Sequence, residues 1–86
     1  MASYKIEVTR SARKAIEKLP KAYIKAVTDT IRQLSEDPRP HGCTKLSGQP
    51  GYRVRVGVYR IIYEVKDDVL VVIVIAVGHR KDVYDR

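Results

Sequence analysis

The stretch that decides the fold is residues 52–65, Tyr52-Arg53-Val54-Arg55-Val56-Gly57-Val58-Tyr59-Arg60-Ile61-Ile62-Tyr63-Glu64-Val65. Apolar and basic side chains alternate at its start, which is the period of a strand with one exposed face. Gly57-Val58 suits a two-residue hairpin turn with glycine at the first central position. The sequence therefore predicts an antiparallel hairpin in which Arg55 faces Arg60. Arg53 then lies opposite Ile62, so the three arginines share one face of the sheet.

A second apolar run, Val69 to Val77, follows this hairpin after the turn residues Asp67-Asp68. Branched apolar residues favour a strand, and a strand that is apolar on both faces belongs inside a sheet or under a cover. We expect this strand to end at Gly78. The run is far shorter than the roughly 20 residues that a membrane-spanning helix needs, so the sequence predicts no membrane partner.

The amino-terminal half predicts a strand and then a helical hairpin. Residues 4–9 alternate in character, and the hydroxyl of Thr9 or Ser11 can cap a first helix. Pro20 disfavours helical geometry at the residue before it, so the first helix stops there and Pro20 opens a second. Each helix carries an apolar stripe at helical spacing, formed by Ala12, Ala15, Ile16 and Leu19 in the first and by Ile24, Val27, Ile31 and Leu34 in the second.

The predicted element order is therefore β-α-α-β-β-β, an α+β fold with an antiparallel sheet packed on an amino-terminal helical hairpin. A chain of 86 residues has room for one core, so we expect a single domain over residues 1–86. The lone Cys43 offers neither a disulfide partner nor metal-ligand spacing, and we expect no metal and no cofactor. A charged amino terminus without an apolar signal stretch predicts a cytoplasmic location.

The charge balance points to polyanionic partners. The chain has 17 Lys and Arg against 10 Asp and Glu, a formal net charge of +7. Charge of this size on a short chain favours RNA, DNA or an acidic protein through steering and counterion release. The predicted helices contribute a basic region of their own, formed by Lys14, Lys18, Lys21 and Lys25. Such lysines most often mark a solvated helix face, and they are also candidates for phosphate contacts.

Several short strings match one toxin family in order and spacing. They are Lys45-Leu46-Ser47-Gly48, Tyr52-Arg53-Val54-Arg55, Tyr59-Arg60-Ile61-Ile62-Tyr63-Glu64-Val65 and Val77-Gly78-His79-Arg80 with Val83-Tyr84. In these strings the chain resembles the RelE side of the RelE/ParE toxin superfamily. The resemblance implies a sheet packed on a helical hairpin and the role of toxin in a type II toxin-antitoxin system. It also implies an acidic, RelB-like antitoxin as the partner.

The resemblance further implies an endoribonuclease, an mRNA interferase that cuts messenger RNA in the ribosomal A site without a metal. In that chemistry a 2′-hydroxyl attacks the adjacent phosphate. By position, Arg60 and Arg80 look like the family's phosphate-binding arginines and Tyr84 like its carboxy-terminal tyrosine. Arg53 and Arg55 occupy two positions where the best-known members carry lysines. Because arginine effectively does not lose its proton, a general-base role does not transfer to Arg53, whereas charge stabilisation does.

Three points stay open at the level of sequence. His79 is a candidate base, because its unperturbed pKa is close to neutrality, but a histidine at a strand end is more often a surface residue. A basic surface for RNA is expected from Lys14, Lys18, Lys21, Lys25, Lys45 and Lys81. The alternative functions are a ParE-like inhibitor of DNA gyrase, which shares the fold, and a non-catalytic RNA-binding module.

Overall fold

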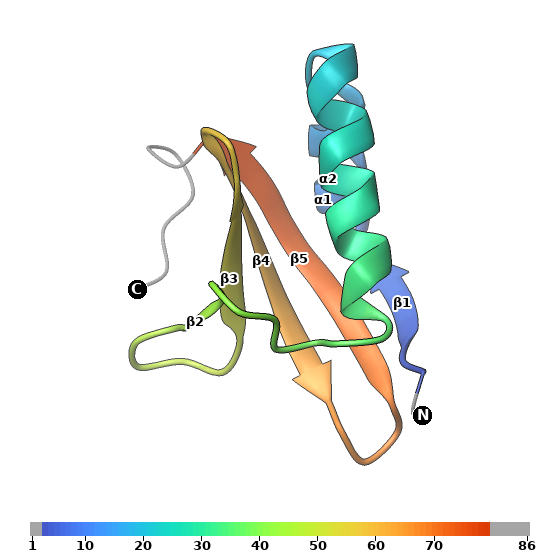
Figure 1. Cartoon of the computed structure of the whole chain (residues 1–86), viewed down its shortest axis with the longest axis vertical. Helices are drawn as coiled ribbons and strands as arrows, with labels where there is room; N and C mark the ends of the chain where they lie inside the picture. The colour runs from blue at the N-terminus through green and yellow to red at the C-terminus, as the bar shows by residue number, and fades with distance from the viewer. Residues whose placement is uncertain (1–2, 80–86) are drawn as a thin grey trace.

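The computed structural model describes residues 3–79 of the chain, so Arg80, Lys81 and Tyr84 lie outside the described residues. Within that range two helices pack on one side of a five-stranded sheet (Figure 1). The elements in chain order are β1 (Lys5–Val8), α1 (Arg10–Glu17), α2 (Lys21–Leu34), β2 (Thr44–Lys45), β3 (Tyr52–Val56), β4 (Tyr59–Lys66) and β5 (Val71–His79). The α+β class and the helical hairpin are confirmed.

The sheet is mixed, and the expectation of a purely antiparallel sheet was wrong. Its strand order is β1-β5-β4-β3-β2, with β1 parallel to β5 and every other neighbouring pair antiparallel. The short strand β2 also extends the predicted order to β-α-α-β-β-β-β. A parallel pair has no turn of its own to announce it in the sequence. The pairing of the first strand with the last strand was therefore invisible to a local pattern.

The predicted β3–β4 hairpin is confirmed residue by residue. Val56 pairs with Tyr59, Arg55 with Arg60 and Arg53 with Ile62. Gly57 has a φ of +60°, which a hairpin turn requires at its first central position and which glycine adopts at little cost. The turn chemistry and the two-residue period together fix this register.

The core lies between the helices and the sheet. Val27 and Leu34 of α2 are fully buried, as are Ile61 and Tyr63 of β4. The buried Tyr63 hydroxyl donates a 2.8 Å hydrogen bond to the carbonyl oxygen of Pro38, and burial raises its pKa. A buried hydroxyl needs such a partner, so this bond fixes the loop after α2 onto the sheet.

The last strand differs from its prediction at both ends. Val69 and Leu70 are 63% and 41% exposed and belong to the turn before β5, where Leu70 adopts a φ of +56°. Gly78 does not end the strand, because it pairs with Arg60 and the ladder continues to His79. The apolar pattern therefore predicted the strand correctly but displaced it by two residues.

A cluster of polar side chains lies at the end of the sheet away from the β3–β4 turn. It is here called the clasp and consists of Arg39, Asp67, Tyr52 and Tyr4. Arg39 donates two hydrogen bonds to the Asp67 carboxylate, at 3.2 and 2.7 Å, and a third to the Tyr52 hydroxyl at 2.9 Å. Tyr4 donates to the same carboxylate at 2.7 Å. The bonds from Arg39 and Tyr4 hold the pKa of Asp67 below its usual value. This clasp ties the amino-terminal segment, the loop after α2 and the β4–β5 turn together.

Candidate functional site

The three predicted arginines lie together on the helix-free face of the sheet. Arg55 of β3 is exposed and sits directly opposite Arg60 of β4, while Arg53 is one strand repeat away on the same face. Arg53 and Arg60 are half-buried. The opposite faces of β3 and β4 carry Val54 and Ile61, which are packed in the core. Strand alternation thus forces the arginines outward as a group, here called the arginine cluster (Arg53, Arg55 and Arg60).

The neighbours of the arginine cluster on β4 and β5 are apolar or small. Arg53 shares its row with Ile62, which is 6% exposed, and with Ala76. Arg60 shares its row with Gly78, which adds no side chain. Farther along β4 Glu64 is engaged by Lys66, with 3.1 Å between the ammonium nitrogen and a carboxylate oxygen. The cross-strand neighbours of Arg53 and Arg60 on these strands are thus Ile62, Ala76 and Gly78.

This arrangement suits the binding of a phosphodiester. Like charges directly opposite each other destabilise a pair of strands, and an anion between them reverses that cost. Each guanidinium offers a planar fork of donors that can bond two phosphate oxygens at once and stays charged. The arginine cluster can therefore bind a phosphate and stabilise the extra negative charge that develops when it is attacked.

His79, the candidate base, does not lie with the arginine cluster. It pairs with Tyr59 at the end of β5, and its ring contacts the Tyr59 ring at a centroid distance of 6.0 Å. Tyr59 in turn contacts Tyr23 of α2, so these rings are on the side of the sheet that the helices cover. The preceding residue, Gly78, is the one that shares the face of Arg60. His79 therefore lies on the helix-covered face of β5, whereas Arg60 is on the other face, and its role as a base stays a prediction.

The predicted RNA-binding lysines within the described residues are exposed. Lys14 belongs to α1, Lys18 follows it, and Lys21 opens α2. Lys25 makes a 3.0 Å ion pair with Asp29 one helical turn later, on a side chain that is 80% exposed. A pair so exposed contributes little to stability. The helical lysines thus form a basic region on the layer opposite the arginine cluster, whereas Lys45 is exposed on the edge strand β2.

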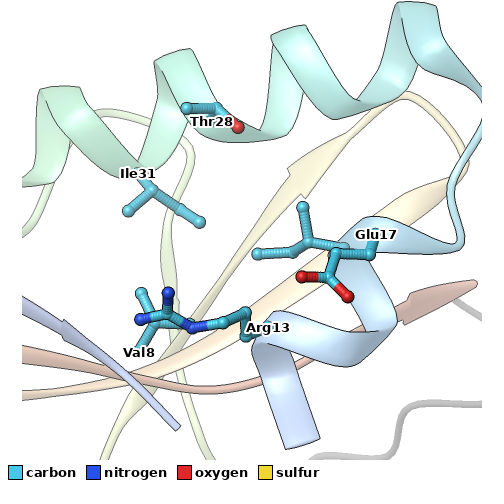
Figure 2. Close-up of a pocket in the computed structure, with 6 residues that line it drawn as sticks. Val8, Arg13, Glu17, Thr28 and Ile31 are labelled. Atoms are coloured by element: carbon cyan, nitrogen blue, oxygen red, sulfur yellow. The ribbon is translucent and has the colours of Figure 1, made fainter. Parts of the chain in front are cut away.

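A cleft of about 240 Å³ lies on the helix side of the molecule. Figure 2 shows Arg13 and Glu17 from α1, Thr28 and Ile31 from α2, and Val8 from β1 around it. Because this cleft lies between the helices and β1, it is separate from the arginine cluster. Among residues 3–79, no group of three His, Cys, Asp or Glu side chains is placed to hold a metal ion. No helix in the described part of the chain is long and apolar enough to cross a membrane.

The sequence of the chain matches a known protein family over most of its length. The sequence model described as ParE toxin of type II toxin-antitoxin system, parDE, matches residues 6–84. The chain belongs to the RelE/ParE toxin superfamily. It is a toxin of the type II toxin-antitoxin class.

The relatives of the toxin place it near the RelE branch. Toxin RelG of Mycobacterium tuberculosis is 32% identical to it over 87 residues, which cover 96% of the toxin and 98% of RelG. The solved RelBE2 toxin-antitoxin complex of the same organism gives a TM-score of 0.83 at 29% identity, over 95% of the toxin and 97% of that chain. The intact E. coli RelBE toxin-antitoxin complex gives 0.79 at 30% identity, over 90% and 96% of the two chains.

Sequence reasoning missed two groups of the toxin. The first is the clasp of Arg39 with Asp67, whose partners are 28 residues apart. The second is the ring contact of Tyr23 with Tyr59, at 4.7 Å between centroids. Tyrosines at these positions read as ordinary core residues, and a tertiary contact between separate elements leaves no periodic signal in the sequence.

Proposed function

We propose that the toxin is a ribosome-dependent, metal-independent endoribonuclease that cleaves messenger RNA in the A site. It acts in the cytoplasm and is held in check by an acidic, RelB-like antitoxin. The observation that carries this proposal is the opposition of Arg55 and Arg60, with Arg53 beside them, on the helix-free face. The RelE-type relatives, solved in complexes with their antitoxins, support the same assignment.

In the proposed reaction the ribose 2′-oxygen forms a bond to the adjacent phosphorus. The bond from phosphorus to the 5′-oxygen of the next nucleotide breaks. A base takes the proton of the 2′-hydroxyl, and the leaving 5′-oxygen gains a proton, so the products are a 2′,3′-cyclic phosphate and a 5′-hydroxyl. The arginine cluster neutralises the pentavalent phosphorane, and in-line alignment of the attacking and leaving oxygens supplies much of the remaining acceleration.

Residues outside the described range complete the proposed site. Arg80 adds a further guanidinium, and Tyr84 stacks on a base or holds the reactive geometry. The lysines Lys14, Lys18, Lys21, Lys25, Lys45 and Lys81 contact phosphates of ribosomal and messenger RNA, which positions the toxin without reading sequence. Specificity then comes from the ribosome and the message in its A site.

The decisive experiment maps RNA ends on a translated message with ribosomes present and absent. The proposal expects new 5′-hydroxyl ends within codons only when ribosomes are present. Replacing Arg60 or Arg80 by Ala should lower the cleavage rate by roughly 10²–10³-fold, the usual cost of removing one preorganised donor. Lys66→Ala, on the same face and strand but paired with Glu64, is the matched control. Unchanged cleavage in both arginine variants contradicts the site.

A second function is favoured by one observation, the match of residues 6–84 to a family described as the ParE toxin. A ParE-like toxin would inhibit DNA gyrase and leave messages intact. A supercoiling assay separates the two functions, because inhibition of gyrase without new RNA ends supports the ParE reading. A non-catalytic RNA-binding module would bind RNA in the same translation extract and produce no 5′-hydroxyl ends.

A further inference from the structure

Three aromatic rings join α2 to the strand ends beside the arginine cluster. Tyr23, in the first turn of α2, meets Tyr59 of β4 edge to face, with 4.7 Å between ring centroids and 68° between ring planes. Tyr59 meets His79 of β5 in the same way, at 6.0 Å and 74°. Edge-to-face contact is a favourable geometry for aromatic pairs. These three residues, here called the ring column, connect one helix and two strands.

Tyr23 of the ring column also lies next to Gly57 in the β3–β4 turn. A Cβ atom added to Gly57 would lie 2.8 Å from Cε1 and 3.1 Å from the hydroxyl oxygen of Tyr23. Real Cβ atoms do not approach so closely, so a side chain at position 57 would displace the Tyr23 ring, which also contacts Tyr59. The φ of +60° disfavours any such side chain as well. Tyr23 therefore packs against the hairpin turn from the helix side.

The turn needs such support because of what lies next to it. The Arg55–Arg60 pair is separated from the turn by a single rung, Val56 with Tyr59. Two opposed guanidinium groups repel each other across the strands. On its other edge the start of β4 pairs with β5 through Tyr59–His79 and Arg60–Gly78, and the contact of Tyr59 with Tyr23 adds support from α2. The rung that closes the hairpin is the one that carries Tyr59.

We propose that Tyr23 and Tyr59 are positioning residues that hold Arg55 and Arg60 side by side. The ring column fixes the start of β4 and the end of β5 against α2, one residue before Arg60 and one residue before Arg80 in the sequence. It acts from the helix side of the sheet, opposite the face that carries the arginine cluster. The consequence for catalysis rests on the proposed function, whereas the consequence for the hairpin does not.

The test compares Tyr23→Ala with Tyr23→Phe in steady-state cleavage of a ribosome-bound message at varied concentrations of that substrate. Loss of the ring should lower kcat by roughly 10- to 100-fold, because small misplacements of catalytic groups cost rate on that scale, with KM changed by less than about 3-fold. Tyr23→Phe keeps the ring contacts and should retain kcat. Gly57→Ala should resemble Tyr23→Ala, since the added methyl displaces the same ring.

Tyr4→Ala is the matched control, because Tyr4 is a half-buried tyrosine whose hydroxyl joins the clasp at the other end of the sheet. It should lower stability without lowering kcat. Hydrogen exchange of the backbone amides of residues 56–60 provides a readout that needs no activity. These amides should exchange faster in Tyr23→Ala and at the wild-type rate in Tyr4→Ala and Tyr23→Phe.

The two proposals fail in different ways. If wild-type toxin makes no ribosome-dependent cuts, the proposed function is wrong, and the exchange rates alone decide whether the ring column holds the hairpin. If wild-type toxin cuts and folded Tyr23→Ala cuts with the same kcat, the positioning role is wrong. Unchanged exchange at residues 56–60 in Tyr23→Ala overturns it independently. A kcat loss that Tyr23→Phe does not rescue also overturns it.

Discussion

Arg55 and Arg60 are two like charges directly opposite each other in the sheet. Facing charges of the same sign make the folded chain less stable than a neutral pair would. The turn of the β3–β4 hairpin and the buried side chains on its core face keep the two arginines in this register. An anion bound between the two guanidinium groups converts the repulsion into two charge-assisted contacts. The Arg55–Arg60 pair therefore lowers the free energy of unfolding of the chain and suits the binding of a phosphate.

Replacing Arg55 by Gln should stabilise the free toxin by about 0.2–1 kcal/mol while it slows cleavage, because the repulsion across the rung disappears. The gain should shrink in high salt, which screens exposed charges. Urea unfolding at low and high salt measures the change. Arg53→Gln is the control, since the residue opposite Arg53 in the β3–β4 ladder is Ile62 and not a second arginine. A gain of the same size in both variants would mean that the rung is not the cause.

The clasp at the opposite end of the sheet should depend on pH. Hydrogen bonds from Arg39 and then from Tyr4 lower the pKa of Asp67 in the folded toxin. A carboxylate whose pKa falls on folding adds stability above its unfolded pKa of about 3.9. That stability is lost as the pH falls through the lower, folded value.

Asp67→Asn should therefore be less stable than wild type near neutral pH, and the difference should disappear in acid below the folded pKa. Urea unfolding of both proteins from about pH 3 to about pH 7 tests this. A difference in the free energy of unfolding that stays constant across the range would show that the Asp67 charge contributes nothing.

At the scale of elements, the hairpin and the helices could be predicted, and the edges of the sheet could not. The register of β3 with β4 follows from a turn of two residues and a period of two, so Arg55 opposite Arg60 was confirmed. The β4–β5 turn takes in Val69 and Leu70, and Leu70 adopts a left-handed φ that sequence rules assign to glycine or asparagine. Reading that pair as strand displaced the predicted β5.

The displacement of β5 relative to its prediction also explains on which face of the sheet His79, the candidate base, lies. We expected Gly78 to end the strand and weighed His79 as a candidate base against the more frequent case of a surface residue at a strand end. Because β5 continues through both residues, alternation sends His79 to the side opposite Arg60. Three of the expected site residues, Arg53, Arg55 and Arg60, are brought together. Arg80 and Tyr84 remain predictions, since they lie outside the described residues.

The start of α1 offers a test at this scale, because the sequence left Thr9 and Ser11 as equal candidates for its cap. The Thr9 hydroxyl oxygen accepts a 3.2 Å hydrogen bond from the Ala12 amide and donates one of 3.0 Å to the carbonyl of Ile75. Thr9→Ala should therefore cost about 1–2 kcal/mol. Ser11→Ala, at an exposed helical position, should cost much less. Equal losses on thermal unfolding would contradict the assignment.

At the scale of the whole molecule, positive charge is present on both layers. The arginine cluster is on the helix-free face of the sheet. The exposed lysines belong to or flank the two helices, which form the other layer (Figure 1). A toxin charged on two sides suits a crevice whose walls are nucleic acid, since each side can meet phosphates. The two basic regions should therefore contribute to different steps, association by the lysines and chemistry by the arginines.

Replacing Lys14, Lys18, Lys21 and Lys25 together by Gln should weaken binding of the toxin to ribosomes and leave the single-turnover rate of the bound complex unchanged. Each lost phosphate contact lowers the salt dependence of log K by about 0.7–0.9, so the loss of four contacts should lower the slope by up to about 3.6. Binding measured across a salt series tests this. An unchanged slope would mean that these lysines form only a solvated helix surface.

The pairing of the first strand with the last strand has a consequence for how the toxin folds. Lys5 of β1 is matched to Val71 of β5, so β5 gains its parallel neighbour only when two segments from opposite ends of the described chain meet. Contacts this distant in sequence form slowly, because closing the long intervening loop costs chain entropy before the contact is made. The β3–β4 hairpin is closed by a two-residue turn and has no such delay. The described sheet should therefore grow outward from this hairpin, with the β1–β5 ladder completed last.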